Sequence, residues 1–169
     1  MLTATGRGML VRVSLVALIV GVSAGHLVAV DGDKAMYVGG TVSALKEKAE
    51  GKLLTTSESE IVFQGGGKGS LSVPYAAISE LEYGQKAGRR VAVAVMVSPL
   101  ALFSKKRNHY LTVTYKDTDG KEQAGVFELG KDIVRTTLKI LEVRSGKEIT
   151  FQDAEACQQY KTPKECQAK

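Results

Sequence analysis

The chain has 169 residues, which favours one domain large enough to bury a hydrophobic core. Its hydrophobic content of 44% and charged content of 24% are ordinary for a globular protein. The net charge of +5 is local: residues 1–30 hold two arginines and no acid, residues 86–107 hold six cations and no acid, and the remainder carries −3. This distribution excludes a uniformly basic body that attracts polyanions over its whole surface.

Residues 1–24 have the order of an export signal. Arg7 and Arg12 precede the apolar stretch Val13–Val22, which small residues follow. A charged region, an apolar region and small residues in this order are typical of a secretory signal peptide, and we expect cleavage after Ala24.

Two further questions about the N-terminus stay open. A start at Met9 rather than Met1 would give a more compact signal, and Leu27-Val28-Ala29 offers a second cleavage site. Without cleavage, Val13–Val30 would form a short membrane anchor. The sequence therefore predicts an exported protein, periplasmic or extracellular, or one held by an uncleaved anchor, with residues 25–35 as a linker.

The two cysteines agree with export. Cys157 and Cys166 lie nine positions apart near the C-terminus, and an oxidising compartment would favour a disulfide between them. The alternative is two unpaired thiols on a frayed tail. No histidine or further thiolate lies nearby, so the pair is a poor metal site, and we expect no metal and no cofactor. Residues 152–169 are predicted to be a polar tail, mobile or loosely helical.

From residue 36 onward the pattern is one of short strands separated by turn residues. In the segment 78–83, apolar residues are interleaved with Glu80 and Glu82, which predicts a half-buried strand with both carboxylates on its solvent face. The other strands predicted before residue 78 are Met36–Val42, Lys52–Thr55, Ile61–Gln64 and Ser70–Val73, with a glycine-rich turn at Gly65–Gly69.

The clearest hairpin lies further along the chain. Leu111, Val113 and Tyr115 alternate with Tyr110 and two threonines, as in a strand. Asp119-Gly120 then supplies a pair favoured at positive φ in tight hairpin turns. The return strand is predicted at 122–129.

The hairpin is followed by a change to helical period. In residues 131–145, Val134, Leu138 and Leu141 fall on one face of a helix. Gly146 is placed to end that helix. A last short strand is predicted at 149–151.

Several strands followed by one amphipathic helix predict an α+β module. The segments that carry a family resemblance are Gly51-Lys52-Leu53, Ile61-Val62-Phe63, Ser72-Val73-Pro74-Tyr75 and Ile78-Ser79-Glu80-Leu81-Glu82-Tyr83. In this order, with the hairpin and helix after them, residues 36–151 resemble bacterial pleckstrin-homology-like (GRAM-like) domains. The resemblance implies a small antiparallel β-barrel or curved sheet capped by one C-terminal helix, in a binding or scaffolding module. The phosphoinositide motif of the eukaryotic relatives has no match here, so inositide binding is not implied.

Residues 91–103 form an almost wholly apolar run, with Arg89–Arg90 before it and Lys105–Lys106–Arg107 after it. Thirteen residues are too few to cross a bilayer as a helix. We interpret Val91–Val97 as a buried strand. For Ser98–Arg107, an exposed interaction loop and a structural cap weigh equally. The residues of this predicted basic-apolar patch are Arg89, Arg90, Leu100, Leu102, Phe103, Lys105, Lys106 and Arg107.

The chain offers little for catalysis. His109 is the one imidazole outside the N-terminal segment, and no carboxylate beside it in the sequence would orient it. Gly65–Ser70 resembles a phosphate-binding loop, but Lys68 is followed by glycine, so a turn explains it better. Asp117–Gly120 lacks the later glutamate of a calcium loop. We therefore expect no enzyme.

Two functions are consistent with these features. The first is an exported, non-enzymatic binding or scaffold module that docks onto an anionic membrane surface or an envelope protein through segment 89–107. Nucleic acid is not an expected partner, because export separates the two and the patch lacks aromatics suitable for base stacking. The alternative is a small-ligand carrier or minor hydrolase using the barrel mouth, which predicts a pocket of convergent polar groups around His109, Tyr110 or Tyr83.

Overall fold

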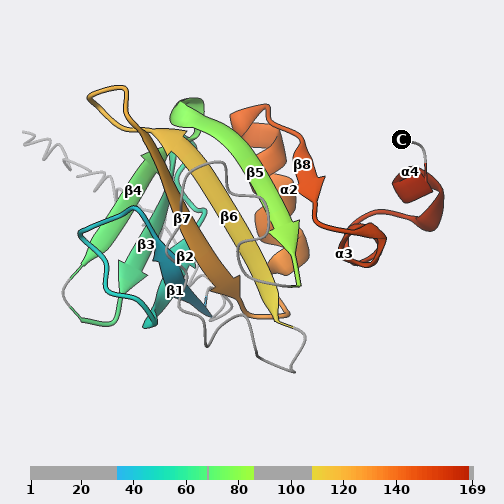
Figure 1. The fold of residues 1–169 in the computed structure, drawn as a ribbon, viewed down its shortest axis with the longest axis horizontal. Coiled ribbons are helices and arrows are strands. Elements are labelled where there is room, and N and C mark those ends of the chain that lie inside the picture. Colours follow the sequence, from blue (N-terminus) through green and yellow to red (C-terminus); the bar gives the residue numbers. More distant parts are fainter. Residues whose placement is uncertain (1–33, 68, 86–107, 168–169) are drawn as a thin grey trace, which may run out of the picture.

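A computed structural model describes residues 34–67, 69–85 and 108–167 (Figure 1). The strands are β1 (Lys34–Gly40), β2 (Ala49–Leu54), β3 (Glu60–Gly65), β4 (Ser70–Pro74), β5 (Ile78–Gly84), β6 (His109–Lys116), β7 (Glu122–Leu129) and β8 (Ile149–Phe151). The helices are α2 (Val134–Ser145), α3 (Ala154–Gln158) and α4 (Pro163–Gln167), with a 3₁₀ turn η1 (Tyr75–Ala77). The basic-apolar patch and segment 1–24 lie outside the described residues.

The eight strands form one curled sheet in the order β4-β3-β2-β1-β7-β6-β5-β8. This half-barrel confirms an α+β fold with a curved sheet. The expectation of a wholly antiparallel sheet is wrong at β8, which pairs with β5 in parallel. The reason is the connection: β7 runs in the same direction as β5, α2 carries the chain back, and β8 therefore enters the sheet along β5. The single expected helix is joined by two short ones.

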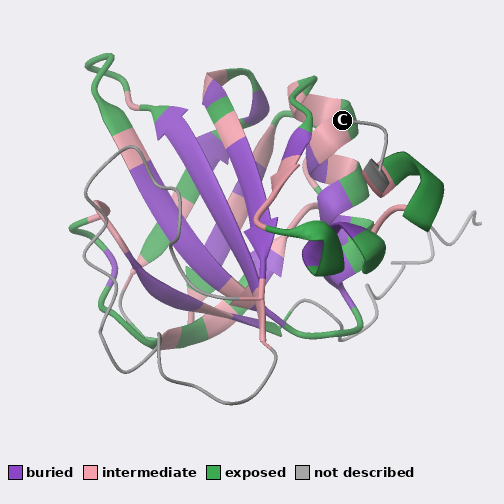
Figure 2. Cartoon of the chain, turned by 45° about the vertical axis from the view of Figure 1, so that its right-hand side comes forward, coloured by how far each residue is buried: buried purple, intermediate pink, exposed green. Residues whose placement is uncertain are grey.

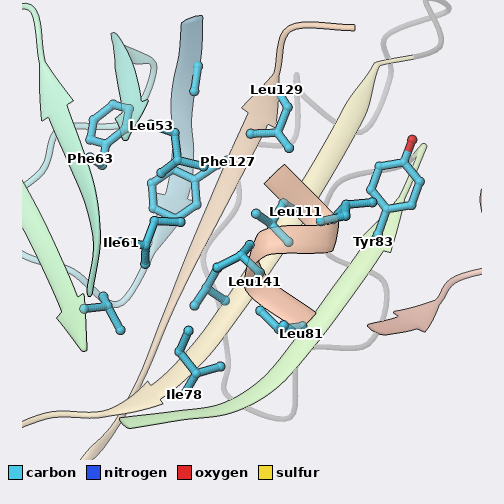
Figure 3. Close-up of a cluster of buried hydrophobic side chains, with 14 of the residues drawn as sticks. Leu53, Ile61, Phe63, Ile78, Leu81, Tyr83, Leu111, Phe127, Leu129 and Leu141 are labelled. Atoms are coloured by element: carbon cyan, nitrogen blue, oxygen red, sulfur yellow. The ribbon is translucent and has the colours of Figure 1, made fainter. Parts of the chain in front are cut away.

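The inner face of the sheet and one face of α2 make the main core. Alternation places Leu111, Val113 and Tyr115 of β6 in this core, as predicted from the sequence. The predicted helix face is also confirmed, since Val134, Leu138 and Leu141 are all buried. Figure 3 shows Leu141 of α2 pointing into the same interior as the side chains of β3, β5, β6 and β7.

The ends of the hairpin and the helix follow local chemistry. In the β6–β7 turn, Gly120 has a φ of 76°, whereas Asp119, also expected at positive φ, does not. The Asp117 carboxylate instead accepts the backbone N–H groups of Asp119 and Lys121 and holds the turn. Helix α2 ends at Gly146, which adopts the left-handed conformation at φ 66° and donates its N–H to Glu142.

The opposite, outer face of the sheet is also buried over β1, β5, β6 and β7 (Figure 2). Val38, Tyr110 and Val126 form a second apolar cluster there, with Met36 packed against it. Glu82 is the main departure from expectation: it is 3% exposed rather than on a solvent face. The reason is its position, because β5 is flanked on both sides by β6 and β8 within a face that is covered.

The C-terminal segment, expected to be a mobile or loosely helical polar tail, forms the two short helices α3 and α4 in its described part, and α3 packs against β5 and β8. Asp153 caps α3 by accepting the N–H of Ala156 at 2.8 Å. Ala156 is fully buried in the main core, and Tyr160 lies beside Phe151 of β8 with ring centroids 5.9 Å apart. A disulfide joins Cys157 and Cys166, whose Cα atoms are 5.8 Å apart, and so ties α4 to α3.

Candidate functional site

An open groove of about 700 Å³ lies on the outer face of the sheet, where β1 begins and β7 ends. The cross-strand register explains why polar side chains gather in it: pairs such as Lys34 with Lys52 and Met36 with Glu50 put neighbouring side chains on the same face. We call this the β1-end groove. Its side-chain lining on the outer face is Lys34, Met36, Glu50, Lys52, Gln64 and Glu128.

The floor of the β1-end groove depends on close backbone packing. A Cβ atom at Gly51 would lie 2.1 Å from the carbonyl oxygen of Gln64 on the next strand. Real Cβ contacts of that length do not occur, so β2 and β3 approach each other this closely because position 51 has no side chain. The groove is thus bounded mainly by paired strands, and Gly66 and Gly130, which directly follow β3 and β7, complete its lining.

Charges of both signs surround the β1-end groove. Among the side chains that line it, Lys34 and Lys52 balance Glu50 and Glu128 formally. Partial burial raises the pKa of Glu128, while hydrogen bonds from Asn108 and Tyr110 oppose that rise. The described residues by themselves therefore give this end no net positive field.

The same end of the sheet is where three segments of the chain meet. In the register, Gly84 at the end of β5 lies opposite Tyr110, and His109 at the start of β6 lies opposite Leu129. Leu129 in turn pairs with Ala35, next to the start of β1. Figure 1 shows the starts of β1 and β6 and the ends of β5 and β7 at the same end of the sheet. The connection between β5 and β6 therefore leaves and re-enters the sheet beside the β1-end groove.

His109 and Tyr83, two of the three residues named for the predicted pocket, contact each other at this corner. The Tyr83 hydroxyl and His109 Nδ1 are 2.6 Å apart, and the two rings stack at 8°. Burial raises the pKa of Tyr83 to about 12. Burial, with a contribution from Lys131, lowers the pKa of His109. Both shifts favour the uncharged forms of the two side chains, which can share one hydrogen bond.

The barrel mouth is filled by side chains. Tyr83 is 0% exposed and Tyr110 4%, so neither ring lines an open pocket. In the interior between strands β2–β4 and strands β6–β7, a cavity of about 10 Å³ is enclosed by apolar side chains that include Leu53, Phe63 and Phe127. That volume is about the space of one water molecule. The carrier or hydrolase alternative predicts a pocket of convergent polar groups here, and two of the three residues named for it, Tyr83 and Tyr110, are buried.

Residues 34–67, 69–85 and 108–167 contain no group of three or more His, Cys, Asp or Glu side chains placed to hold a metal ion. Within the same ranges, no helix combines the length and apolar character needed to cross a bilayer. Glu80 and Glu82 are the alternating pair of acids noted in the sequence. Glu80 is half-buried and Glu82 is buried.

Sequence reasoning missed the β1-end groove. A partial signal was present, since the alternation in Ala49–Leu54 puts Glu50 and Lys52 on one face of a strand. What the sequence did not contain was the pairing of that strand with β1 and β3, which brings Met36 and Gln64 to the same surface.

The comparisons with known proteins give no family for this chain. No protein-family model matches it, and a search of curated proteins finds no significant relative.

Proposed function

We propose that the protein is an exported, non-enzymatic binding or scaffold module with a pleckstrin-homology-like fold, which docks onto an anionic membrane surface with the β1-end groove edge facing that surface. One observation carries this proposal: both ends of the connection that contains the basic-apolar patch lie at this edge, at Gly84 and His109. The helix-capped half-barrel supports the fold assignment, and the disulfide supports an oxidising compartment.

The length of the chain limits where the cations can be. A chain reaches at most about 3.6 Å per residue, so Lys86 lies within about 7 Å of Gly84. By the same limit, Lys105 to Arg107 lie within about 14 Å of His109. Since the described charges that line the groove balance, we expect these four cations to give this end of the sheet a positive excess.

The size of the effect is sufficient for reversible docking. Each lysine or arginine near an anionic lipid surface contributes about 1 kcal/mol, so these four cations would contribute about 4 kcal/mol. The apolar residues Leu100, Leu102 and Phe103 would add burial at the interface if that loop inserts. Salt weakens the electrostatic part of this attraction.

Co-sedimentation with liposomes tests the proposal. The full-length exported protein is compared with the Lys105→Glu/Lys106→Glu/Arg107→Glu variant on vesicles that contain an anionic lipid. We expect binding of the natural sequence to fall at least about tenfold in the variant and to weaken with added salt, because three attractive charges become repulsive.

A matched control separates a local effect from net charge. Lys116, Lys121 and Lys147 are exposed, and the first two flank the β6–β7 turn at the opposite end of the sheet. Their replacement by glutamate changes the net charge by the same amount and should leave binding within about twofold. Equal binding by the patch variant and the natural sequence contradicts the membrane proposal, and a pull-down from envelope fractions would then test a protein partner.

Export is tested separately. Mass spectrometry of the protein purified from the envelope or medium of an expressing bacterium should show loss of residues 1–24. A mature protein that keeps Met1 or Met9 and sediments with membranes would instead support the anchor. A protein found whole in the cytosol would contradict export.

A further inference from the structure

The outer face of β1, β7, β6 and β5 is more deeply buried than a solvent face of a sheet. Val126 is 0% exposed, Val38 2% and Tyr110 4%. The polar residues of this face are also covered, since Thr112 and Thr114 on β6 and Glu82 on β5 are each 5% exposed or less. One face of an antiparallel sheet is commonly solvated, whereas here both faces are removed from water.

The described part of the chain does not supply a layer over this face. The apolar cluster on it consists of strand residues alone, from β1, β6 and β7. Helix α2 packs on the other face, where Leu138 and Leu141 join the main core. In Figure 1, α2 lies behind β5 and β6, and no labelled helix or strand lies in front of them. The described helices and strands therefore do not account for the low exposure of this face.

We infer that the outer face of β1, β7, β6 and β5 is a docking surface for residues 91–97 of this same chain, the Val-Ala repeat. Both ends of the connection that contains them are fixed at one end of this face, at Gly84 and His109. Strands β5 and β6 pair directly with each other, so the repeat is not a strand inserted between them. It forms a layer on the sheet.

The lengths agree with this arrangement. Seven extended residues span about 23 Å, close to the length of β6, which is about 27 Å for 8 residues. Five residues (86–90) lie between Gln85 and Val91, and eleven (98–108) lie between Val97 and His109. Both linkers are long enough to carry the repeat out over the sheet and return it to the start of β6.

The chemistry of the two surfaces is complementary. The face presents valine, alanine, tyrosine and threonine side chains, which suit close packing against small and β-branched residues. Carboxylates lie on the same face, at Glu80, Glu82 and Glu128, while Arg89 and Arg90 precede the repeat. On the proposed function, on which this step rests, residues 13–22 form the export signal and are removed by cleavage, so they do not compete for this face.

Thiol labelling tests the inference without any binding partner. The native cysteines form a disulfide, so Thr112→Cys adds the single free thiol, on the face in question. We expect it to react with a maleimide about 100-fold more slowly than the exposed thiol of the control Thr136→Cys on α2. Replacement of residues 91–97 by a seven-residue Gly-Ser linker should bring the two rates within about tenfold. Fast labelling in the intact chain, or slow labelling that persists in the linker variant and ends on removal of residues 1–30, overturns the inference.

Disulfide trapping decides the matter if the linker variant fails to fold. Thr112→Cys is combined in turn with Ala92→Cys, Val93→Cys, Ala94→Cys and Val95→Cys, and with Ala17→Cys as the competing segment. After mild oxidation, peptide mass spectrometry should find position 112 bonded to at least one position of the repeat. A bond to position 17, or no bond to any of the four positions, contradicts the assignment of 91–97 as the cover.

Discussion

At the scale of single residues, the corner formed by Tyr83 and His109 joins the end of β5 to the start of β6. The hydroxyl and Nδ1 lie 2.6 Å apart, and Tyr83 also meets the edge of the Phe151 ring. Because burial lowers the pKa of His109 from its ordinary value of 6.5, the folded protein favours the neutral ring. The corner therefore links stability to pH.

We predict that the free energy of unfolding decreases as the pH falls through 6.5. Above that pH the imidazole is neutral in both states, but below it the unfolded chain binds a proton at the ordinary pKa of histidine while the folded chain does not. Urea unfolding at pH 7.5 and 5.5 measures the change. In His109→Gln the decrease in unfolding free energy between these two pH values should be smaller. His26 is present in both proteins, so its contribution does not affect the difference between them. An identical decrease in the two proteins would exclude His109 as its source.

Gly51 provides a second prediction at this scale. The substitution Gly51→Ala places a Cβ 2.1 Å from the Gln64 carbonyl oxygen, so β2 and β3 must separate locally. Overpacking of this kind costs about 1–3 kcal/mol of unfolding free energy, measured by urea denaturation. In the turn, Gly67 has open space around its Cβ position, and Gly67→Ala should change stability by less than about 0.5 kcal/mol. Equal effects of the two changes would refute the steric explanation.

At the scale of elements, Arg144 anchors the end of α2 to the loop between β2 and β3. Its Nη1 atom donates to the carbonyl oxygens of Thr55 and Ser57, each at 2.5 Å. The guanidinium also lies 5.6 Å from the centre of the Tyr75 ring. One side chain thus joins the helix to two segments that precede β5.

We predict that Arg144→Leu lowers the unfolding free energy by about 2–3 kcal/mol, since two carbonyl groups lose a charged donor. Arg144→Lys should restore part of that loss, because an ammonium group reaches only some of the same acceptors. Lys139 is the control, because its side chain is 66% exposed and forms a salt bridge with Glu142. Lys139→Ala should lower the unfolding free energy by less than about 1 kcal/mol. Thermal or urea unfolding that ranks Arg144→Leu with the control would show that the anchor is unimportant.

The disulfide acts at the same scale, on α3 and α4. Closing a loop of this size stabilises the connected segment by about 2–3 kcal/mol in the chain-entropy model. In the Cys157→Ser/Cys166→Ser variant we expect tryptic cleavage after Lys161 and Lys164 to become about 30- to 100-fold faster. The sheet should remain intact in the same digest, because its strands do not depend on α4. Unchanged cleavage would mean that packing alone holds the segment.

At the scale of the whole molecule, an aromatic cluster connects β3 with β1 and β7 across the interior of the curled sheet. Phe63 of β3 lies 5.3 Å from Phe127 of β7 and 6.4 Å from Tyr37 of β1, measured between ring centroids. These strands are separated in the sheet order but meet in the interior because the sheet is curved. The curvature is therefore stabilised by side chains as well as by strand pairing.

We predict that Phe63→Ala lowers the unfolding free energy by about 3–5 kcal/mol, as expected for a large ring removed from a close-packed core. Phe63→Leu retains most of the volume and should cost less than half as much. Val143 on α2 is 67% exposed, so Val143→Ala should be close to neutral. If Phe63→Ala lowers the unfolding free energy only slightly, the curvature that brings β3 close to β1 and β7 does not depend on this aromatic cluster.

The sequence alone determined those elements whose patterns are local. The β6–β7 hairpin and helix α2 were predictable because turn residues and apolar periodicity lie within one short segment, and Gly146 marks the end of α2 by its own φ preference. The existence of an α+β fold follows from the same local patterns.

Tertiary structure decided what depends on segments far apart in the chain. The parallel pairing of β8 with β5 and the β1-end groove follow from which strands are neighbours in the sheet. The burial of Glu82 depends in addition on the covering of its face. The packing of the C-terminal residues also required the partner surface, since a polar stretch gives no signal of the few buried positions, such as Ala156, that attach it. A strand's own residues specify its two faces, but only its neighbours determine which of them meets water.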